Sequence, residues 1–526
     1  MRDFHMPGRS TVYATQGLCA TSHPLAAKTA VSILEDGGNA IDAAIAAAVL
    51  LGLCEPQMTG LGGDCFALVK PAGTDTIHTV NGSGRAPAAL TGEALRAYGH
   101  VVVPKTSASA VTMPGAVDAF CRMSDKWGKL GIDHVLAPAI HYAEAGIPVA
   151  PRVAFDWALH SAKLQGVAGR YFLVDGKALG EGQVFRAPGQ AAVLRKIATQ
   201  GRDGFYSGDV ASDLVTSLRA LGGVHTEDDF AKVEATFGGP IQGHYRGVDL
   251  VEHPPNGQGA AAILMTRILA QFDLASLEPF GAERAHLELE AAKLAHATRD
   301  IFMGDPDHGG SIEELLSEET AKGLAARIVR NAVLPNPKAV AESIHKETVY
   351  VAVVDKDGMA VSLIYSIFDD FGSGLASDRF GILFHNRGAG FNLTPGHPNE
   401  AGGGKRPLHT ILPAMLTRGG RLDTVFGVMG GGYQPTGHTR MVTNWTDFGM
   451  GLQAALDAPR CFAHPEGTHI ERGYAPEVLA DLAARGHDIH VPDTPLGGAQ
   501  AIRINYETGV LEGASDPRKD GCALGY

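Results

Sequence analysis

One stretch, residues 345–366, limits the folds open to this 526-residue chain more than any other. Its first half alternates valine with other residues, and residues 355–358 form a typical turn sequence that ends in glycine. A second run of β-branched and apolar residues follows the turn. A fold-back centred in the turn places Thr348 opposite Tyr365, with Ser366 beside it. The sequence therefore predicts a β-hairpin with two hydroxyl side chains at its open end.

The composition indicates a compact globular protein. Hydrophobic residues make up 45% of the chain and charged residues 19%, which is typical of proteins that bury a large core. The net charge is −13, and no run of Lys or Arg is present, so nucleic-acid binding is disfavoured. The longest apolar run, residues 40–53, is too short to span a bilayer, and residues 1–7 lack the apolar core of an export signal. We expect a cytoplasmic protein that binds neither nucleic acid nor membranes.

The sequence predicts no metal and no cofactor. The six cysteines are scattered without a C-x-x-C pair or a zinc-like spacing, so we interpret them as reduced thiols. His487 and His490 come nearest to a metal motif, and histidine pairs at this spacing are usually structural. The glycine-rich loop 58–64 precedes a predicted strand and lacks the Lys-Ser/Thr end of a phosphate-binding loop.

Periodicity and breaker residues predict the other elements. Asn39 is a good cap for an Ala-rich helix that is apolar nearly all round, which is typical of a buried helix. Residues 115–345 are expected to be mainly helical. The remaining expected elements are helices at 24–36, 40–53, 437–448 and 475–485, and strands at 65–70 and 76–81.

Two glycine-rich segments follow the hairpin, at residues 371–374 and 427–432. Together with Thr348 they resemble the small subunit of γ-glutamyltranspeptidases, which are N-terminal-nucleophile hydrolases. Residues 405–410 and 513–518 also resemble motifs of this family, and the resemblance covers nearly the whole chain. It implies an α/β fold of the αββα sandwich type, with two central antiparallel sheets covered by helices.

The resemblance implies a nucleophile made by self-cleavage. Breaking an amide near neutral pH needs a nucleophile, a base and an oxyanion site. A threonine at a new N-terminus supplies a hydroxyl and an α-amine whose pKa is about 7.7–8.0. The expected cleavage therefore lies between Glu347 and Thr348, and gives fragments 1–347 and 348–526 that stay together as one intertwined fold. The expected assembly is an αβ heterodimer of these fragments, or an (αβ)2 dimer of them.

The family pattern also assigns roles to residues around the nucleophile. Ser366 corresponds to a hydroxyl that hydrogen-bonds the nucleophile. Gly430 and Gly431 correspond to the oxyanion hole, where glycine lets backbone N–H groups approach the developing charge. Arg85, on a Gly-flanked turn, matches the arginine that pairs with the substrate carboxylate, and a guanidinium suits this task because it donates two parallel hydrogen bonds.

The chain departs from the transpeptidase pattern where the glutamyl amine binds. The expected Asn, Gln and Asp are replaced by Phe368, Arg387 and, approximately, Gly390. The family's pair of hydroxyl residues is His409-Thr410, and the family's lid over the glutamyl site has no counterpart because residues 391–405 are few. An ammonium at this place would meet an aromatic ring, a cation and a glycine. The pattern predicts a site for a carboxylate without an amine.

These departures are similar to the oxamate amidohydrolase branch of the family. The expected reaction is hydrolysis of a small carboxylate-bearing amide, oxamate to oxalate and ammonia, as part of purine catabolism, with Arg85 holding the carboxylate and Arg387, His409, Thr410 and Phe368 completing the pocket. One alternative is a γ-glutamyltranspeptidase or glutathione hydrolase; another is a glutaryl-cephalosporin-type acylase. A third, from a different class, is a relative without catalysis that only binds a carboxylate ligand.

Overall fold

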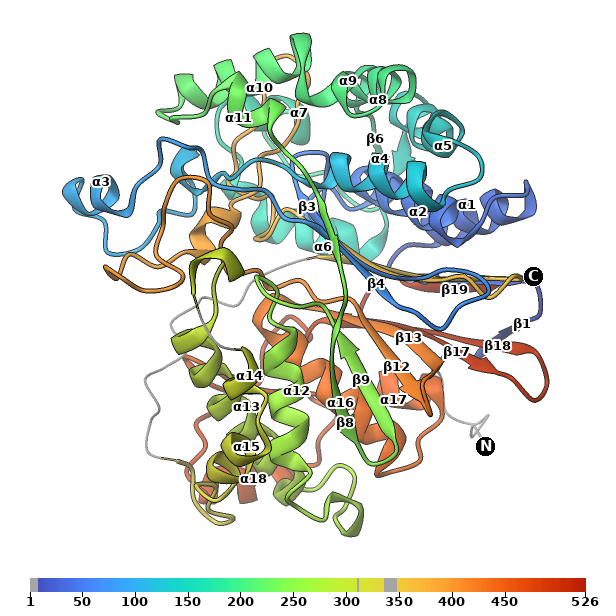
Figure 1. Cartoon of the computed structure of the whole chain (residues 1–526), viewed down its shortest axis with the longest axis vertical. Helices are drawn as coiled ribbons and strands as arrows, with labels where there is room; N and C mark the ends of the chain where they lie inside the picture. The colour runs from blue at the N-terminus through green and yellow to red at the C-terminus, as the bar shows by residue number, and fades with distance from the viewer. Residues whose placement is uncertain (1–7, 310–311, 335–347) are drawn as a thin grey trace.

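A computed structural model describes residues 8–309, 312–334 and 348–526. Two stacked β-sheets form the centre of the molecule, and helices cover the outer face of each sheet (Figure 1). The order of layers from top to bottom of Figure 1 is helices, sheet, sheet, helices. The predicted αββα sandwich is confirmed.

The upper sheet contains the hairpin in its middle. All its neighbouring strands are antiparallel, and the central position leaves both faces of the hairpin buried. Its strands in spatial order are β19 (Cys522–Gly525), β2 (Gly17–Thr21), β10 (Val349–Asp355), β11 (Ala360–Ser366), β3 (Asp64–Lys70), β4 (His78–Gly82) and β7 (Thr236–Gly238).

The hairpin forms as predicted, but its register differs by one residue. Val349, not Thr348, pairs with Tyr365, so the continuation of the ladder brings Thr348 opposite Ser366. The side chain of Asp355 explains the shift, because its Oδ1 accepts hydrogen bonds from the backbone N–H groups of residues 357 and 359, both at 3.0 Å. This cap fixes a longer turn than the sequence suggested.

The lower sheet is also antiparallel and packs against the first. Two of its strands come from the region that was expected to be mainly helical, so that expectation was too broad. Their alternation of apolar and polar residues over 241–252 is that of strands with one face against a core. The strands in spatial order are β1 (Val12–Ala14), β18 (Val510–Ser515), β17 (Gly498–Asn505), β13 (Arg421–Met429), β12 (Ala414–Arg418), β9 (Val248–Glu252) and β8 (Ile241–Tyr245).

Strand β10 contributes to two cores. Val349, Val351 and Val353 pack among the upper helices, which confirms the predicted shared face. Tyr350 and Ala352 point the other way, into the core between the two sheets. The strand thus joins the upper helical layer to the sheet interface.

The upper helices include the two that the sequence located best. Helix α1 spans Pro24–Glu35 and α2 spans Ala40–Cys54, and the whole of α2 is buried. Asn39 caps α2 as expected, in a reciprocal capping box with Asp42. The other helices of this layer are α4 (Ala116–Trp127), α5 (Ile132–Ala145), α6 (Pro151–His160), α7 (Val167–Phe172), α8 (Pro188–Gln200), α9 (Asp203–Tyr206), α10 (Gly208–Ala220) and α11 (Glu227–Ala231).

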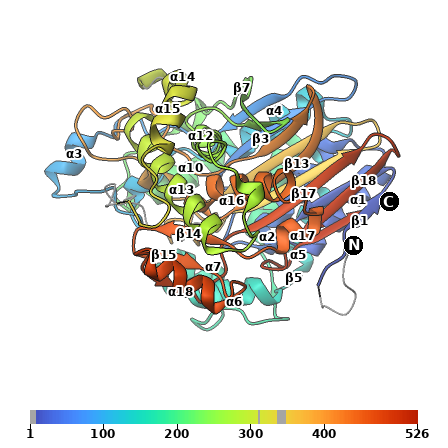
Figure 2. The same ribbon diagram turned by 90° about the horizontal axis from the view of Figure 1, so that it is seen from below.

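The lower helices cover the second sheet (Figure 2). Two expected helices lie here, and both are confirmed with shifted ends: α16 spans Gln434–Thr446 and α18 spans Pro476–Ala484. Along the described ranges, no helix combines the length and apolarity needed to cross a bilayer. The other lower helices are α12 (Gly259–Leu269), α13 (Ala282–Phe302), α14 (Ile312–Leu315), α15 (Glu318–Ala325) and α17 (Leu452–Asp457).

A glycine in β13 sets the distance between the two sheets at the hairpin. A Cβ at Gly427 would lie 2.3 Å from Cε2 of Tyr350. We predict that Gly427→Ala lowers the free energy of unfolding by about 1–3 kcal/mol, because the core has no room for the methyl group. Denaturant unfolding measures the change. Gly323→Ala in α15 is the matched control, since nothing lies within 4 Å of its Cβ position; equal effects of the two variants would contradict this packing.

Candidate active site

Thr348 lies at the open end of the hairpin, next to the first residue of β10. Its side chain is buried, and its Oγ1 donates a hydrogen bond to Oγ of Ser366 at 3.2 Å. Ser366 is the last residue of β11. Adjacent strands of one sheet therefore hold the two hydroxyl groups in contact, as the sequence predicted.

Ser366 is itself fixed by a tight backbone turn. Its Oγ accepts a hydrogen bond from the backbone N–H of Phe368 at 2.8 Å and one from Nη2 of Arg387 at 3.4 Å. Phe368 has a φ of 80°, a left-handed conformation that is costly for a bulky residue and is often found at functional sites. The turn aims the serine hydroxyl at Thr348 and the phenyl ring at Arg387.

Arg387 brings together most of the residues that the sequence assigned to substrate binding. Its guanidinium carbon lies 4.1 Å from the centre of the Phe368 ring, and its Nη1 donates to Oγ1 of Thr410 at 3.1 Å. The side chain is fully buried. A buried guanidinium on an aromatic face, next to the predicted nucleophile, is a strong site for an anion.

The sequence analysis missed the residue that neutralises this arginine. Asp64, the first residue of β3, places its Oδ2 3.6 Å from Nε of Arg387 and 3.2 Å from ring nitrogens of both His385 and His409. Its Oδ1 accepts from the backbone N–H of Gly84 at 3.1 Å. In the sequence, Asp64 appeared only as the last residue of the glycine-rich loop. No local motif indicates its contacts with His385, Arg387 and His409, which lie more than 300 positions away.

Contacts with two histidines keep Asp64 ionised. Burial by itself raises the pKa of this carboxyl group, but His385 and His409 lower it further than burial raises it, so the pKa is held well below its usual range. Burial, together with the nearby charge of Arg387, lowers the pKa of His409 to about 3. His409 is therefore neutral near pH 7; its Nδ1 accepts from the N–H of Ile411 at 3.3 Å and its Nε2 contacts Asp64. Both ring nitrogens are engaged, so His409 positions its neighbours.

Glycine-rich loop 58–64 brings Asp64 to this place. A Cβ at Gly63 would lie 2.5 Å from the carbonyl oxygen of Ser366, and one at Gly62 would lie 2.0 Å from that of Leu383. The loop therefore packs directly on the backbone at the end of β11, the strand that carries Ser366. Its glycines allow this close approach of the two backbones.

Gly430 and Gly431 lie at the end of β13, where the chain turns into a short 3₁₀ helix, Gly431–Tyr433, and then into α16. Their φ values, 119° and 54°, favour glycine. Backbone N–H groups at such a helix start carry partial positive charge, which suits an oxyanion.

Gln258 links the turn at Gly430 and Gly431, called the glycine turn below, to Thr410, which contacts Arg387. Its Nε2 donates to the carbonyl oxygens of Thr410 at 2.6 Å and Gly431 at 3.0 Å, and its Oε1 accepts from Arg299 at 2.5 Å. A continuous series of hydrogen bonds thus runs from Thr348 through Ser366, Arg387 and Thr410 to the glycine turn. Gln258 was another residue that the sequence analysis did not identify.

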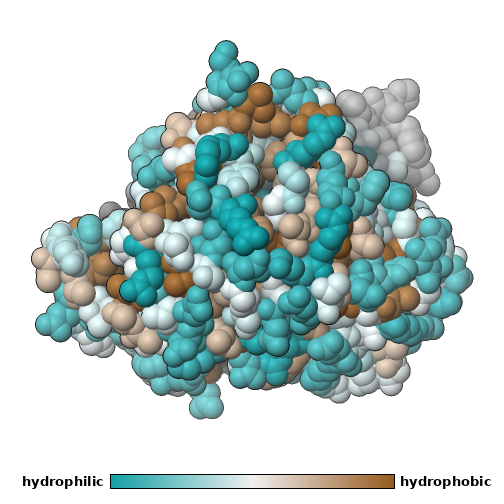
Figure 3. Space-filling view, turned by 90° about the horizontal axis from the view of Figure 1, so that it is seen from above, coloured by the Kyte–Doolittle hydropathy of each residue, from teal (hydrophilic) through white to brown (hydrophobic). Residues whose placement is uncertain are grey.

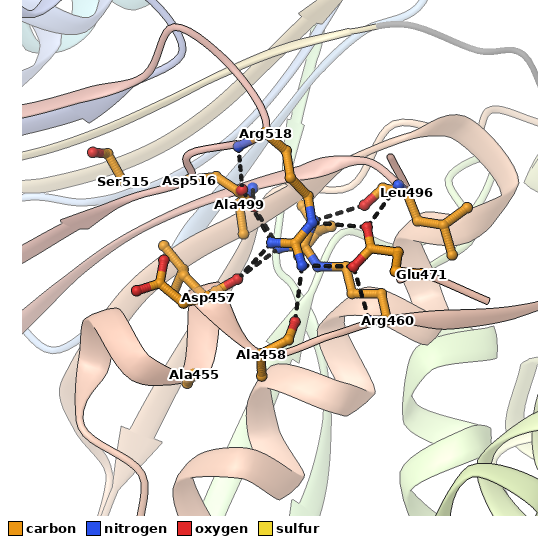
Figure 4. A network of polar contacts seen from close by, with 12 residues as sticks. Ala455, Asp457, Ala458, Arg460, Glu471, Leu496, Ala499, Ser515, Asp516 and Arg518 are labelled. Carbon is orange, nitrogen blue, oxygen red and sulfur yellow. Dashed lines mark hydrogen bonds and ion pairs between the residues drawn. The ribbon is translucent and has the colours of Figure 1, made fainter. Parts of the chain in front are cut away.

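A buried cluster of charged residues (Figure 4) holds residues 496–499, the segment that packs against Gly430. Arg460 pairs with Asp516 at 2.5 Å, and Arg518 pairs with Glu471 at 2.6 Å. The cluster binds the backbone at both ends of residues 496–499, and a Cβ at Gly430 would lie 3.1 Å from the Cα of Gly497 in that segment. The motif at residues 513–518 therefore has a structural role, because its Asp516 and Arg518 belong to this cluster.

Arg85 lies apart from these contacts. It is partly exposed, pairs with Asp305 at 3.2 Å and Asp307 at 3.3 Å, and donates to the carbonyl oxygen of Gly404 at 2.9 Å. It lines a cavity of about 260 Å³ together with Arg406. The structure does not bring Arg85 into the hydrogen-bonded group around Thr348, and its role as carboxylate ligand stays a prediction. Glu347 lies outside the described residues.

A second cavity, of about 510 Å³, lies beside Phe368. Residues 101–105 and 389–394 line it with mostly apolar side chains. Its charged lining residues are Asp300 and Lys105, and Lys105 pairs with Asp369 at 3.2 Å. The preceding helix α3 (Gly92–Ala97) projects from the body at the left of Figures 1 and 3, and Tyr98, Val101 and Val102 are exposed on the segment that follows. This cavity offers room for a group larger than an amide nitrogen.

Comparison with known proteins decides the family. The model of the family described as gamma-glutamyltranspeptidase matches residues 26–526. The chain belongs to this family. It is accordingly an N-terminal-nucleophile amidohydrolase that acts on carbon–nitrogen amide bonds.

Three relatives illustrate the range of named activities. A Glutathione hydrolase-like YwrD proenzyme of Bacillus subtilis is 35% identical over 98% of this chain and 99% of its own length. An Oxamate amidohydrolase proenzyme of Klebsiella pneumoniae is 34% identical over 98% and 100%. The crystal structure of a cephalosporin acylase from Bacillus halodurans is 38% identical, with a TM-score of 0.93 over 100% of this chain and 99% of that one.

We predict that Asp64→Asn lowers both stability and substrate affinity. The change leaves Arg387 as a buried charge without its counter-ion, which typically costs about 3–5 kcal/mol. Because the pKa of Asp64 is depressed in the folded protein, its contribution is fully present above the ordinary aspartate pKa of about 3.9 and is lost as the pH falls below it.

Urea unfolding of both proteins between pH 3 and 8 tests this dependence. The difference in unfolding free energy between wild type and Asp64→Asn should be constant from about pH 5 to 8 and shrink toward pH 3. Asp118→Asn is the control, since it removes a buried carboxylate that pairs with Arg202 at 2.7 Å outside this network. That control should leave KM unchanged; a KM effect of similar size would contradict the role of Asp64.

Proposed function

We propose that this protein is a self-processing hydrolase of small amides that carry a carboxylate and no amine, with oxamate as its substrate and oxalate and ammonia as its products. The observation that carries the proposal is the buried Arg387 guanidinium, held between Phe368 and Thr410 and in contact with Ser366. The 34% identity to an oxamate amidohydrolase supports the same substrate.

The first step of the proposed mechanism is cleavage of the chain between Glu347 and Thr348. The Thr348 hydroxyl attacks the carbonyl carbon of Glu347, the peptide C–N bond breaks, and the acyl group passes from nitrogen to oxygen. Water then hydrolyses the ester. The products are residues 1–347, the large fragment, and residues 348–526, the small fragment, which stay together as an αβ heterodimer. The relatives are named as proenzymes, which supports this order of events.

The second stage uses the new N-terminus. The α-amine of Thr348 takes the proton of its own hydroxyl as Oγ1 attacks the amide carbon. The N–H groups of Gly430 and Gly431 stabilise the oxyanion. The intermediate collapses, the α-ammonium gives a proton to the leaving nitrogen, and ammonia departs from an oxalyl ester. Water, deprotonated by the same amine, attacks the ester and releases oxalate. Ser366 orients the hydroxyl throughout.

The charges of the site favour a carboxylate over an ammonium. Arg387 presents a guanidinium where a γ-glutamyl substrate places its amine, according to the family pattern. An ammonium there would be desolvated beside a fixed cation, which costs several kcal/mol. A carboxylate instead completes a paired, charge-assisted contact. The pocket thus selects by charge more than by size.

A second candidate, an acylase that releases a larger amine, is favoured by one observation. The cavity of about 510 Å³ beside Phe368 has mostly apolar walls, with Lys105 and Asp300 as its charged residues, and the similar solved structure is named a cephalosporin acylase. In that case the carboxylate of a glutaryl-type acyl group would take the place proposed here for oxamate. A substrate panel separates the two functions.

We predict that Thr348→Ala stays a single full-length chain without amidase activity. Thr348→Ser keeps a hydroxyl and is the matched control, which should still process. A denaturing gel and N-terminal sequencing, expected to begin Thr-Val-Tyr, make the measurement. A fully active chain that is never cut would show that Thr348 is not the nucleophile.

We predict that oxamate is hydrolysed with a higher kcat/KM than a γ-glutamyl anilide or a glutaryl amide on one enzyme preparation. Ammonia or amine release measures the three rates. Arg387→Ala should raise KM for oxamate by about 10²-fold, the size of a lost charge-assisted contact of about 2–3 kcal/mol, and Arg387→Lys should recover only part of the loss.

Arg85→Ala is the comparison that assigns the carboxylate ligand. If Arg85→Ala raises KM strongly and Arg387→Ala does not, Arg85 is the carboxylate ligand. In that case the substrate would have to displace the two aspartate partners of Arg85. If the γ-glutamyl donor is the best substrate, the proposed charge selection is wrong. If the glutaryl amide is best, the acylase candidate replaces oxamate hydrolysis.

A further inference from the structure

A buried cluster of two histidines and a glutamate lies in the lower helical layer. His286 and Glu290 are one helical turn apart on α13, and His487 follows α18 (Figure 2). One nitrogen of each histidine and one carboxylate oxygen of Glu290 lie within 4.8 Å of one another. The cluster cannot be recognised as a motif in the sequence, because His487 is about 200 residues from His286 and Glu290.

The second nitrogen of each ring is already held by the protein. Nε2 of His286 contacts the carbonyl oxygen of Val329 at 2.9 Å, and Nδ1 of His487 contacts Oγ1 of Thr468 on β15 (Gly467–Ile470) at 3.1 Å. The two inner nitrogens, Nδ1 of His286 and Nε2 of His487, hydrogen-bond to each other at 2.8 Å. Metal-binding histidines are oriented in this way, with the outer nitrogen fixed by a carbonyl or hydroxyl group and the inner one aimed at the ion.

The hydrogen bond between the rings can give way to an ion without loss of a proton. With one proton per ring, Nε2 of His286 donates to the carbonyl oxygen of Val329, so Nδ1 of His286 accepts the hydrogen bond from Nε2 of His487. An ion would replace this hydrogen bond once the proton of His487 moves to Nδ1, where Oγ1 of Thr468 can accept it.

From this geometry we infer that His286, Glu290 and His487 form a structural site for a divalent ion of the zinc type. Two imidazole nitrogens and one carboxylate oxygen are a donor set that Zn²⁺ prefers. This differs from the expectation from the sequence, which found no metal motif. The fourth position of a tetrahedral ion is left for water.

The charges around the cluster restrict the choice of ion. Lys293 contacts Glu290 at 2.7 Å, and Arg485 adds positive charge near both histidines, although it is paired with Asp481 at 2.8 Å. These cations raise the cost of placing a dication here. An ion held mainly by oxygen, such as Mg²⁺ or Ca²⁺, would not overcome that cost, whereas imidazole-seeking ions gain most from the two nitrogens.

The position of the site gives the ion a role. His286 and Glu290 precede residue 348 and His487 follows it, so the ion would join the two fragments expected from cleavage. Glu290 also accepts from the N–H of Leu334 at 2.7 Å, and Arg485 accepts through its carbonyl oxygen from the N–H of Val333 at 3.0 Å. The ion therefore fastens the last described residues of the large fragment to the small fragment.

Metal analysis and calorimetry of the full protein test the inference. The purified protein is treated with EDTA, dialysed, and titrated with Zn²⁺, Mg²⁺ or Co²⁺. We expect about one Zn²⁺ bound per chain, the one-site occupancy of a structural zinc, a rise in Tm of several degrees with Zn²⁺ and none with Mg²⁺, and the visible absorption of four- or five-coordinate Co²⁺. Binding to the folded form is what raises Tm.

Variants distinguish this site from adventitious binding. Glu290→Gln and the double variant His286→Gln/His487→Gln should lose the Zn²⁺-induced rise in Tm and the Co²⁺ absorption. His490→Gln, an exposed histidine paired with Asp488, is the control and should keep both. The comparison uses the change on adding metal, so a general loss of stability does not disturb it. No rise in the wild type, or an equal rise in the double variant, overturns the proposal. Neither result depends on the substrate proposed above.

Discussion

The active site depends on one buried carboxylate. Asp64 contacts Arg387, His385 and His409 through a single oxygen, and the N–H of Gly84 through the other. A guanidinium without this partner would be very costly to bury. With it, the cation is kept away from water close to Thr348, where the proposed anionic substrate would interact with it most strongly. The histidines and the glycine loop that carries Asp64 make this arrangement rigid.

In the proposed function, the same arrangement lets the site distinguish charge without a large pocket. Arg387 is fixed by Phe368 on one face and by hydroxyl groups of Ser366 and Thr410 at its edge. These contacts leave it little freedom to follow a misplaced substrate. Ser366 contacts both Thr348, the proposed nucleophile, and Arg387, the proposed substrate ligand. In the proposed function, substrate binding and the geometry of the nucleophile are therefore coupled through Ser366.

The sequence predicted what is local and missed what is assembled from distant segments. The contact of Thr348 with Ser366 follows from one hairpin, and only the turn capped by Asp355 moved the register by one residue. The Asn39 cap and the buried helix behind it were equally local. Asp64, His385 and Gln258 could not be found this way, because their partners are brought near by the packing of sheets and loops. The aspartate partners of Arg85 were hidden for the same reason.

The strand order of the upper sheet has a consequence for how the protein can be made. A cut before Thr348 assigns β10, β11 and β19 to one polypeptide and β2, β3, β4 and β7 to the other, yet β2 lies between β19 and β10 and pairs with both. Strands of the two polypeptides would therefore alternate at this end of the sheet. With the proposed cut, the chain would therefore have to fold before it is divided. Fragments produced from separate genes would each expose unpaired strand edges, which are prone to aggregation.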